Sequence, residues 1–147
     1  MRGTRKLRHL TGNWRKRRCR QYARPSLLIS RGEIFWVNFG ATRGREQAGQ
    51  RPAVVIQNDA GNASSETTIV ALITSRRFSR PYPFHVEIGP ADSGLQDPST
   101  ILLEQMQTVS IQRLRRRIGL LSADVMVEVD RAIHHSLGLD TCLFNGY

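Results

Sequence analysis

The sequence predicts one mainly β domain with a single C-terminal helix, in which five to seven short strands form a small, strongly curved antiparallel sheet or barrel. Three observations predict this fold class. Short apolar and β-branched runs alternate with stretches rich in glycine, proline and polar residues. The final segment changes to helical spacing. A length of 147 residues suits one domain rather than two.

The first half of the domain contains three expected strands. Ile34 and Trp36 lie on one face of the first strand, with Phe35 and Val37 on the other. The next two strands are apolar and β-branched, which is typical of buried strands. The expected strands are residues 32–39, 51–58 and 67–75, separated by loops over residues 40–50 and 59–66.

The second half continues with shorter elements. Two prolines close together exclude a regular element over residues 76–83, which form a basic, aromatic loop. Residues 89–98 are rich in turn-forming residues. The remaining elements are expected as a strand at 84–88, one or two strands at 99–109 broken near Glu104-Gln105, a helical turn at 110–114 and a strand at 116–121.

The last segment predicts one amphipathic helix over residues 122–138. Ser122 is a candidate N-cap, Asp124 falls in the first turn, and Gly138 is a plausible stop. One apolar face recurs at helical spacing and comprises Val125, Met126, Val129, Ala132, Ile133 and Leu137.

The positive charge is concentrated at the N-terminus. The net charge is +10, and residues 1–30 contain ten Lys or Arg and no acidic residue. Residues 31–147 carry twelve Arg and all twelve acids, so they sum to zero. We therefore expect a basic, disordered extension over 1–30 and a folded domain over 31–147. Trp14 and Tyr22 suggest stacking on single-stranded bases, but a solvated tail is the favoured interpretation.

Cysteine and histidine usage argues against several classes of protein. Cys19 and Cys142 make neither a disulfide framework nor a metal-ligand spacing, so a reducing cytoplasm is expected. His134 and His135 point about 100° apart on a helix and are a poor metal pair. We expect no metal site and no cofactor. No apolar run approaches the length of a membrane helix, so no membrane association is expected.

Three segments together carry a more specific signal. The first is RGEI at 31–34 followed by GREQAGQRPAVVIQND at 44–59. The second is the strand at 69–74, which ends in Thr, and the third is ILLEQMQTV at 101–109. In this order the segments resemble the MazF/PemK family of endoribonuclease toxins from type II toxin–antitoxin systems. The resemblance covers residues 31–140, and the tail lies outside it.

The resemblance implies a fold, partners and a reaction. The fold would be the SH3-like barrel that these nucleases share with CcdB-type gyrase poisons, assembled as a homodimer and bound by a MazE-like antitoxin. The reaction would be metal-independent cleavage of single-stranded RNA, mainly messenger RNA, at short sequence motifs. The 2′-hydroxyl attacks the adjacent phosphate, which leaves a 2′,3′-cyclic phosphate and a 5′-hydroxyl.

The family's catalytic positions map onto Arg51, Thr74 and Glu46. An Arg fork binds two phosphate oxygens and keeps its charge throughout the reaction. A Thr hydroxyl can donate to a non-bridging oxygen, and a carboxylate can accept a proton. Considered without the resemblance, Arg51 simply pairs with Glu46, and Thr74 is an ordinary residue at a strand end.

Further residues are candidates for RNA binding. Several combine charge with stacking surface, although they could instead cover the edge of the barrel. Arg45 replaces the Ser that the family pattern usually has before the Glu-Gln pair. The candidates are Arg45, Gln47, Arg76, Arg77, Phe78, Arg80 and Gln105. His85 is expected to make a structural hydrogen bond, and the basic run at 113–117 is expected to be a solvated face.

Two other functions remain open at this point. One is a CcdB-type gyrase poison, which acts through the end of its C-terminal helix. The other is a non-catalytic nucleic-acid-binding module that uses the basic tail.

Overall fold

The computed structural model describes residues 28–40, 49–80 and 82–139. Within them, six antiparallel strands and one long C-terminal helix confirm the predicted class, for which five to seven strands were expected. Most of the predicted tail, residues 1–27, lies outside the described residues. The elements in chain order are β1 (Glu33–Asn38), β2 (Gln50–Val55), α1 (Asp59–Ser64), β3 (Thr67–Thr74), β4 (His85–Ile88), α2 (Pro90–Ser93), β5 (Ser99–Ser110), the 3-10 turn η2 (Ile111–Arg113), β6 (Leu114–Leu120) and α3 (Ala123–Leu137).

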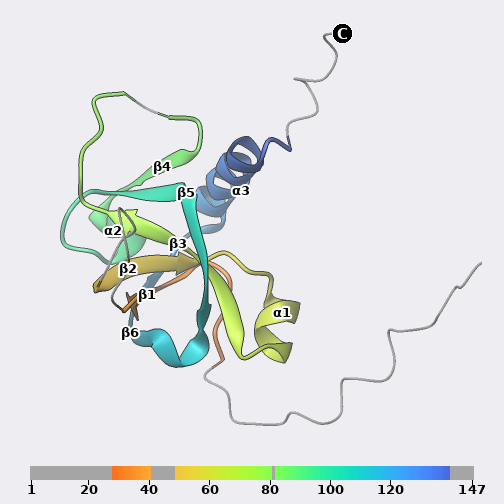
Figure 1. Cartoon of the computed structure of the whole chain (residues 1–147). Helices are drawn as coiled ribbons and strands as arrows, with labels where there is room; N and C mark the ends of the chain where they lie inside the picture. Colours follow the sequence, from red (N-terminus) through yellow and green to blue (C-terminus); the bar gives the residue numbers. More distant parts are fainter. Residues whose placement is uncertain (1–27, 41–48, 81, 140–147) are drawn as a thin grey trace, which may run out of the picture.

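The strands form a sheet in the order β4-β5-β3-β2-β1-β6. The long strand β5 pairs with both β3 and β4. Its register against β3 shifts, because Ala71 pairs with Met106 whereas Leu72 pairs with Leu102. Residues 103–105 therefore bulge, which confirms the predicted break near Glu104-Gln105 and places it inside one strand. A bulge bends its strand, and β5 is visibly bent in Figure 1.

Apolar side chains pack on both faces of this sheet. Ile34 of β1 joins a cluster with Val129 and Ala132 of α3. Phe35 and Val37 of β1 join the second cluster, because successive side chains of a strand point to opposite faces. The two-faced pattern predicted for β1 is thereby confirmed. The second cluster also includes residue 29, which is buried ahead of β1.

The helix α3 matches its prediction closely. The Ser122 hydroxyl accepts a hydrogen bond from Val125 N at 3.3 Å, and Gly138 caps the other end in the left-handed conformation, with φ +67°. In Figure 1 the helix lies beside β4 and β5, which are the strands that it contacts. Five residues of the predicted apolar face, Val125, Met126, Val129, Ala132 and Ile133, pack in the core cluster, whereas the sixth, Leu137, is exposed.

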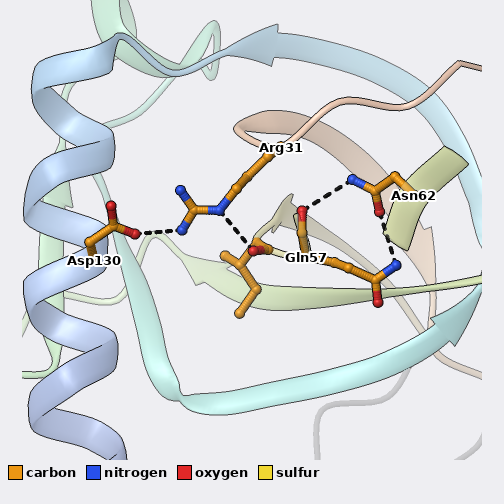
Figure 2. Close-up of polar contacts among 5 residues, drawn as sticks. Arg31, Gln57, Asn62 and Asp130 are labelled. Carbon is orange, nitrogen blue, oxygen red and sulfur yellow. Dashed lines mark hydrogen bonds and ion pairs between the residues drawn. The ribbon is translucent and has the colours of Figure 1, made fainter. Parts of the chain in front are cut away.

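The expected loop over residues 59–66 is wrong in its first part, because α1 forms there. Asn58 Oδ1 accepts a hydrogen bond from Gly61 N at 2.7 Å and caps the helix. Asn62 is buried and donates to the Gln57 carbonyl (Figure 2). It also accepts from the Thr68 hydroxyl at 2.8 Å. This buried network stabilises a helix that local composition does not favour. The expected turn region after β4 likewise contains the four-residue helix α2.

Arg31 joins three parts of the fold (Figure 2). Its Nε donates to the Ile56 carbonyl at 2.9 Å, and its Nη2 contacts Asp130 Oδ1 of α3 at 2.5 Å. Its backbone N–H donates to Asp59 Oδ1 at 2.7 Å, at the start of α1. The Arg of the RG motif is thus a structural residue that ties the start of the domain to α1 and α3.

The helix α2 connects the two edge strands. It follows β4 directly and packs against β6, the strand at the other edge. Two glycines allow this approach. A Cβ at Gly119 would lie 2.4 Å from the Ser93 carbonyl oxygen, and one at Gly94 would lie 2.9 Å from the Ile118 carbonyl oxygen. The contact brings the segment after α2 alongside the start of β2 and the end of β3.

Candidate active site

Arg51 and Thr74 line the same cleft, which has a volume of about 520 Å³. Arg51 is the second residue of β2, and Thr74 is the last residue of β3. These antiparallel strands pair Ala53 with Leu72, so continuing the register by two positions sets Arg51 across from Thr74. The strand pairing thus brings together two residues that are distant in sequence.

Arg51 presents a solvent-exposed guanidinium to this cleft. Its backbone is held in the sheet opposite Val37 of β1, and Pro52 follows it. The ion pairs made among the described residues do not involve Arg51. Within the described residues, its donors are therefore not engaged by a carboxylate. The alternative pairing with Glu46 falls on a residue outside the described ranges.

Thr74 is half-buried and oriented by a local hydrogen bond. Its Oγ1 accepts from Arg76 N at 3.2 Å, and its backbone pairs with Thr100 of β5. Because the hydroxyl oxygen serves as the acceptor in this bond, the hydroxyl proton can be donated to a ligand. The end of β3 thus fixes the position of the Thr74 hydroxyl, and the bond from Arg76 N makes its oxygen an acceptor there.

Two residues that the sequence did not predict also line the cleft. Trp36 of β1 was predicted only to share a strand face with Ile34, and it is half-exposed and lines the cleft with Arg51. Arg116 of β6 was taken as part of a solvated basic run, and it adds a second guanidinium to the same cleft. β6 reaches the cleft because it pairs with β1, the neighbour of β2, and α2 packs against it. Asp97, in the segment after α2, is an acidic residue in the lining.

A second cleft of about 490 Å³ adjoins the first, since Ser75 and Ser99 line both. The predicted RNA-binding residues Arg76, Arg77 and Phe78 line it. The Arg76 guanidinium lies over the Phe78 ring at 5.7 Å from its centroid, a cation–π arrangement. We call the two clefts together the groove. Positive charge and aromatic surface therefore continue outward from Arg51 and Thr74.

The groove ends in a recess of about 30 Å³ that is lined by Arg80, Phe78 and His85, among others. His85 Nε2 lies 2.8 Å from Glu104 Oε1, so the structural hydrogen bond expected for this histidine is confirmed. Its side chain is only 6% exposed.

The other predicted site residues fall elsewhere. Arg45, Glu46 and Gln47 lie outside the described residues. Gln105 is half-buried in the β5 bulge and is absent from the lining of the groove and the recess. The structure therefore does not bring Gln105 to the site.

The described part of the chain also bears on metal binding and on membrane insertion. No group of three or more His, Cys, Asp or Glu side chains is placed there to hold a metal ion. None of the helices in these residues is long and apolar enough to span a membrane.

Residues 30–137 match the family described as PemK-like, MazF-like toxin of type II toxin–antitoxin system. The chain belongs to this family. The match spans all six strands and α3, and it includes both Arg51 and Thr74.

Solved structures agree with the family assignment. MazF from Deinococcus radiodurans is 28% identical, with a TM-score of 0.63 over 76% of this chain and 97% of that one. A MazE–MazF structure from the same organism is 29% identical, with a TM-score of 0.61 over 77% and 98% of the two chains. A mycobacterial endoribonuclease in complex with its cognate antitoxin shares the fold at 22% identity, with a TM-score of 0.65 over 76% and 96%. The MazF/PemK toxins form a family of toxin–antitoxin endoribonucleases, and this chain is a member of it.

Proposed function

We propose that this toxin is a sequence-specific, metal-independent endoribonuclease that cleaves single-stranded RNA, chiefly messenger RNA, and so inhibits translation and growth. The observation that carries the proposal is the meeting of Arg51 and Thr74 in one cleft. An exposed guanidinium beside an oriented hydroxyl is a suitable pair for binding a phosphodiester group.

The proposed reaction uses a nucleophile that belongs to the substrate. The ribose 2′-oxygen attacks the adjacent phosphorus and loses its proton to a base. The bond from phosphorus to the 5′-oxygen then breaks, and that oxygen takes up a proton. The products are a 2′,3′-cyclic phosphate and a 5′-hydroxyl, so the protein must supply proton transfer and charge stabilisation only.

Arg51 is proposed to hold two non-bridging phosphate oxygens through its planar fork. Charge increases on these oxygens as the phosphorus becomes pentacoordinate, and preformed donors stabilise that charge most in the transition state. Arg116, which lines the same cleft, adds positive charge for the neighbouring phosphate. The guanidinium thus takes the part that a divalent cation has in other nucleases.

Thr74 is proposed to donate its hydroxyl proton to a non-bridging oxygen, because its own oxygen already accepts from Arg76 N. Glu46 is proposed as the proton acceptor, on the basis of the family pattern, from the segment that precedes β2. Arg45 and Gln47 of that segment are proposed contacts to the RNA.

The groove gives the RNA a path away from the scissile phosphate. Arg76 and Arg77 offer contacts to phosphates, and Phe78 offers a face for base stacking. Single-stranded RNA fits such a groove because its bases are free to stack and its backbone is fully exposed. Arg80 extends the same positive lining toward the recess.

Three further proposals follow from membership of the family. The active form is a homodimer, and a MazE-like antitoxin inhibits it by laying an acidic segment across the groove. Residues 31–147 carry the nuclease, while the basic segment 1–30 adds salt-dependent attraction to RNA. The toxin acts in the cytoplasm, where messenger RNA is found.

The proposal is tested by incubating the protein with mixed-sequence single-stranded RNA in EDTA. We expect discrete cuts with cyclic phosphate ends. Arg51→Ala should lower the cleavage rate by about 10²–10³-fold, because it removes a donor to the developing charge. Arg115→Ala is the matched control, since Arg115 is an exposed arginine of β6 that does not line the groove. Its rate should stay near that of the wild type.

Other results would favour the other two functions. Intact RNA together with altered plasmid supercoiling would indicate a gyrase poison. RNA binding without cleavage that disappears when residues 1–27 are deleted would indicate a binding module.

A further inference from the structure

The recess at the end of the groove contains a histidine that the proposed reaction does not use. Phe78, Glu87 and Thr100 line both the recess and the 490 Å³ cleft, so the recess opens from the path proposed for the RNA. Its volume of about 30 Å³ suits a single functional group rather than a whole ring.

The hydrogen bond to Glu104 determines which nitrogen of His85 carries a proton. An ionised carboxylate only accepts hydrogen bonds, so Nε2 must donate across the 2.8 Å contact. In the neutral imidazole, Nδ1 is then a bare acceptor. This Nδ1 is buried and has no hydrogen-bond partner among the described residues. Buried polar atoms without a partner are rare and call for an explanation.

Aromatic rings hold the imidazole from three sides. Phe78 lies at 4.5 Å between ring centroids, Phe84 at 5.0 Å and Tyr82 at 5.1 Å. Tyr82 stacks on Phe84 at 5.3 Å but is itself 46% exposed. It is therefore the least packed of the three, and its ring can turn aside to admit a ligand and stack upon it.

We propose that this recess reads one base of the RNA by its exocyclic amino group, with His85 Nδ1 as the acceptor. The inference rests on the proposed endoribonuclease function. Adenine N6 and cytosine N4 are amino groups at the end of the Watson–Crick edge where guanine O6 and uracil O4 are carbonyl oxygens, and the amino group of guanine, N2, lies at the opposite end of that edge. A carbonyl facing Nδ1 would set two acceptors against each other.

The other polar groups of the recess fit this assignment. Glu87 places a second acceptor beside the recess, and an amino group has two hydrogens to donate. Arg80, which also lines the recess, is a donor suited to the phosphate of the same nucleotide. Glu104 is a positioning residue, because it acts on the base only by fixing the protonation of His85.

The test is the cleavage of a randomised single-stranded RNA pool, sequenced around each cut. At one position near the cut we expect adenine and cytosine to exceed guanine and uracil by about 10–100-fold, the range for one well-made base contact. His85→Gln should reduce this preference to about one, because the Gln amide can still donate to Glu104 but offers no acceptor at the Nδ1 position.

Glu104→Gln provides the second variant. Its amide can present either oxygen or nitrogen to Nε2, so both tautomers of His85 become possible and the amino preference should weaken. Preferences at other positions, and the dependence of cleavage on Arg51, should remain unchanged in both variants. An unchanged preference in folded His85→Gln, or no position that separates amino from keto bases, would overturn the proposal.

A binding measurement separates this inference from the proposed nuclease function. Nitrogen-15 NMR of the His85 ring should show the Nε2–H tautomer in the free protein. Cytidine 5′-monophosphate should shift the Nδ1 resonance, and uridine 5′-monophosphate should shift it far less. If cytidine 5′-monophosphate shifts the resonance but the protein cuts no RNA, the proposal for the recess stands and the proposed nuclease function is contradicted. If both nucleotides give equal shifts or none, the recess does not recognise an amino group of a base, even if the protein cuts RNA.

Discussion

At the scale of single residues, the candidate site depends on two side chains whose positions come from strand pairing. Arg51 and Thr74 are unremarkable when each is considered alone, since an exposed Arg and a Thr at a strand end are common. The family motif identified them as candidates, and the register of β2 and β3 explains why they lie in one cleft. The chemistry proposed for them depends on the donors that they direct into one cleft.

Thr74 allows a sharp test of its hydroxyl. Thr74→Val keeps the shape of the side chain but cannot donate to phosphate, so we expect the cleavage rate to fall by about 10²-fold or more. Thr74→Ser keeps the hydroxyl and should remain within about 10-fold of the wild type, because the same bond from Arg76 N can orient it. Single-turnover cleavage rates measure both variants. Equal activity of the Val and Ser variants would show that the Thr74 hydroxyl takes no part in the reaction.

Trp36 and Arg116 show what residue-level interpretation misses. The alternation in β1 placed Trp36 beside Ile34, and this parity is compatible with the structure. The two residues nevertheless differ in exposure, because Ile34 lies in the core whereas Trp36 lines the cleft. Arg116 was one of several arginines in a run, and no local feature distinguishes it from Arg115.

At the scale of elements, the site is framed by the contact between α2 and β6. Neither element was predicted to touch the other, because they are separated by the whole length of β5. Gly94 and Gly119 allow their backbones to approach at distances that a Cβ would prevent. Ile118 and Arg116 of β6 line the same cleft as Thr74.

Gly119→Ala tests the importance of this close approach. Its Cβ would lie 2.4 Å from the Ser93 carbonyl oxygen, so α2 or β6 must move. We expect a loss of about 1–3 kcal/mol in the free energy of unfolding, as for other overpacked sites, together with weaker RNA cleavage. Urea denaturation measures the first effect.

The matched control is Gly89→Ala, in the same connection. There the nearest atom to a Cβ is Asp92 Oδ2 at 3.5 Å, an ordinary contact. This variant should stay within about 0.5 kcal/mol of the wild type. A Gly119→Ala protein as stable and active as the control would show that the α2–β6 contact adjusts freely.

At the scale of the whole molecule, charge and connectivity are distributed unevenly. The folded part from residue 31 onward is neutral in sum, yet the groove collects Arg51, Arg76, Arg77 and Arg116. The local field at the groove is therefore positive without any help from the N-terminal tail. Arg31, which is absent from the lining of the groove, links the first described residues to α1 and α3, and Figure 2 shows its contact with Asp130 of α3.

A double-mutant cycle tests this link. Arg31→Ala should lower the free energy of unfolding by about 1–3 kcal/mol, because it also leaves the Ile56 carbonyl without its charged donor. Asp130→Ala should cost only about 0.2–1 kcal/mol, since the Asp130 side chain is 52% exposed and the ion pair is screened by water. Urea denaturation of the four proteins gives the coupling. Equal losses for the two single variants would mean that the ion pair accounts for all of the effect.

The sequence by itself determined the elements whose signals are local. Hydrophobic period, caps and turn residues identified β1, β3 and α3, and the N-cap Ser122 and the stop at Gly138 were found where they were expected. The joint motif identified the family and its candidate catalytic residues. These features were predictable because each depends on neighbours within a few positions along the chain.

The tertiary structure decided the features that depend on distant contacts. The helix α1 is stabilised because Asn62 donates a hydrogen bond to the Gln57 carbonyl and accepts one from the Thr68 hydroxyl in a buried network. The cleft forms where β2 begins, β3 ends and α2 reaches β6, and the recess forms where Glu104 of β5 meets His85 of β4. Composition and spacing do not encode which surfaces approach one another, since packing energy is realised only when separate segments are brought into contact.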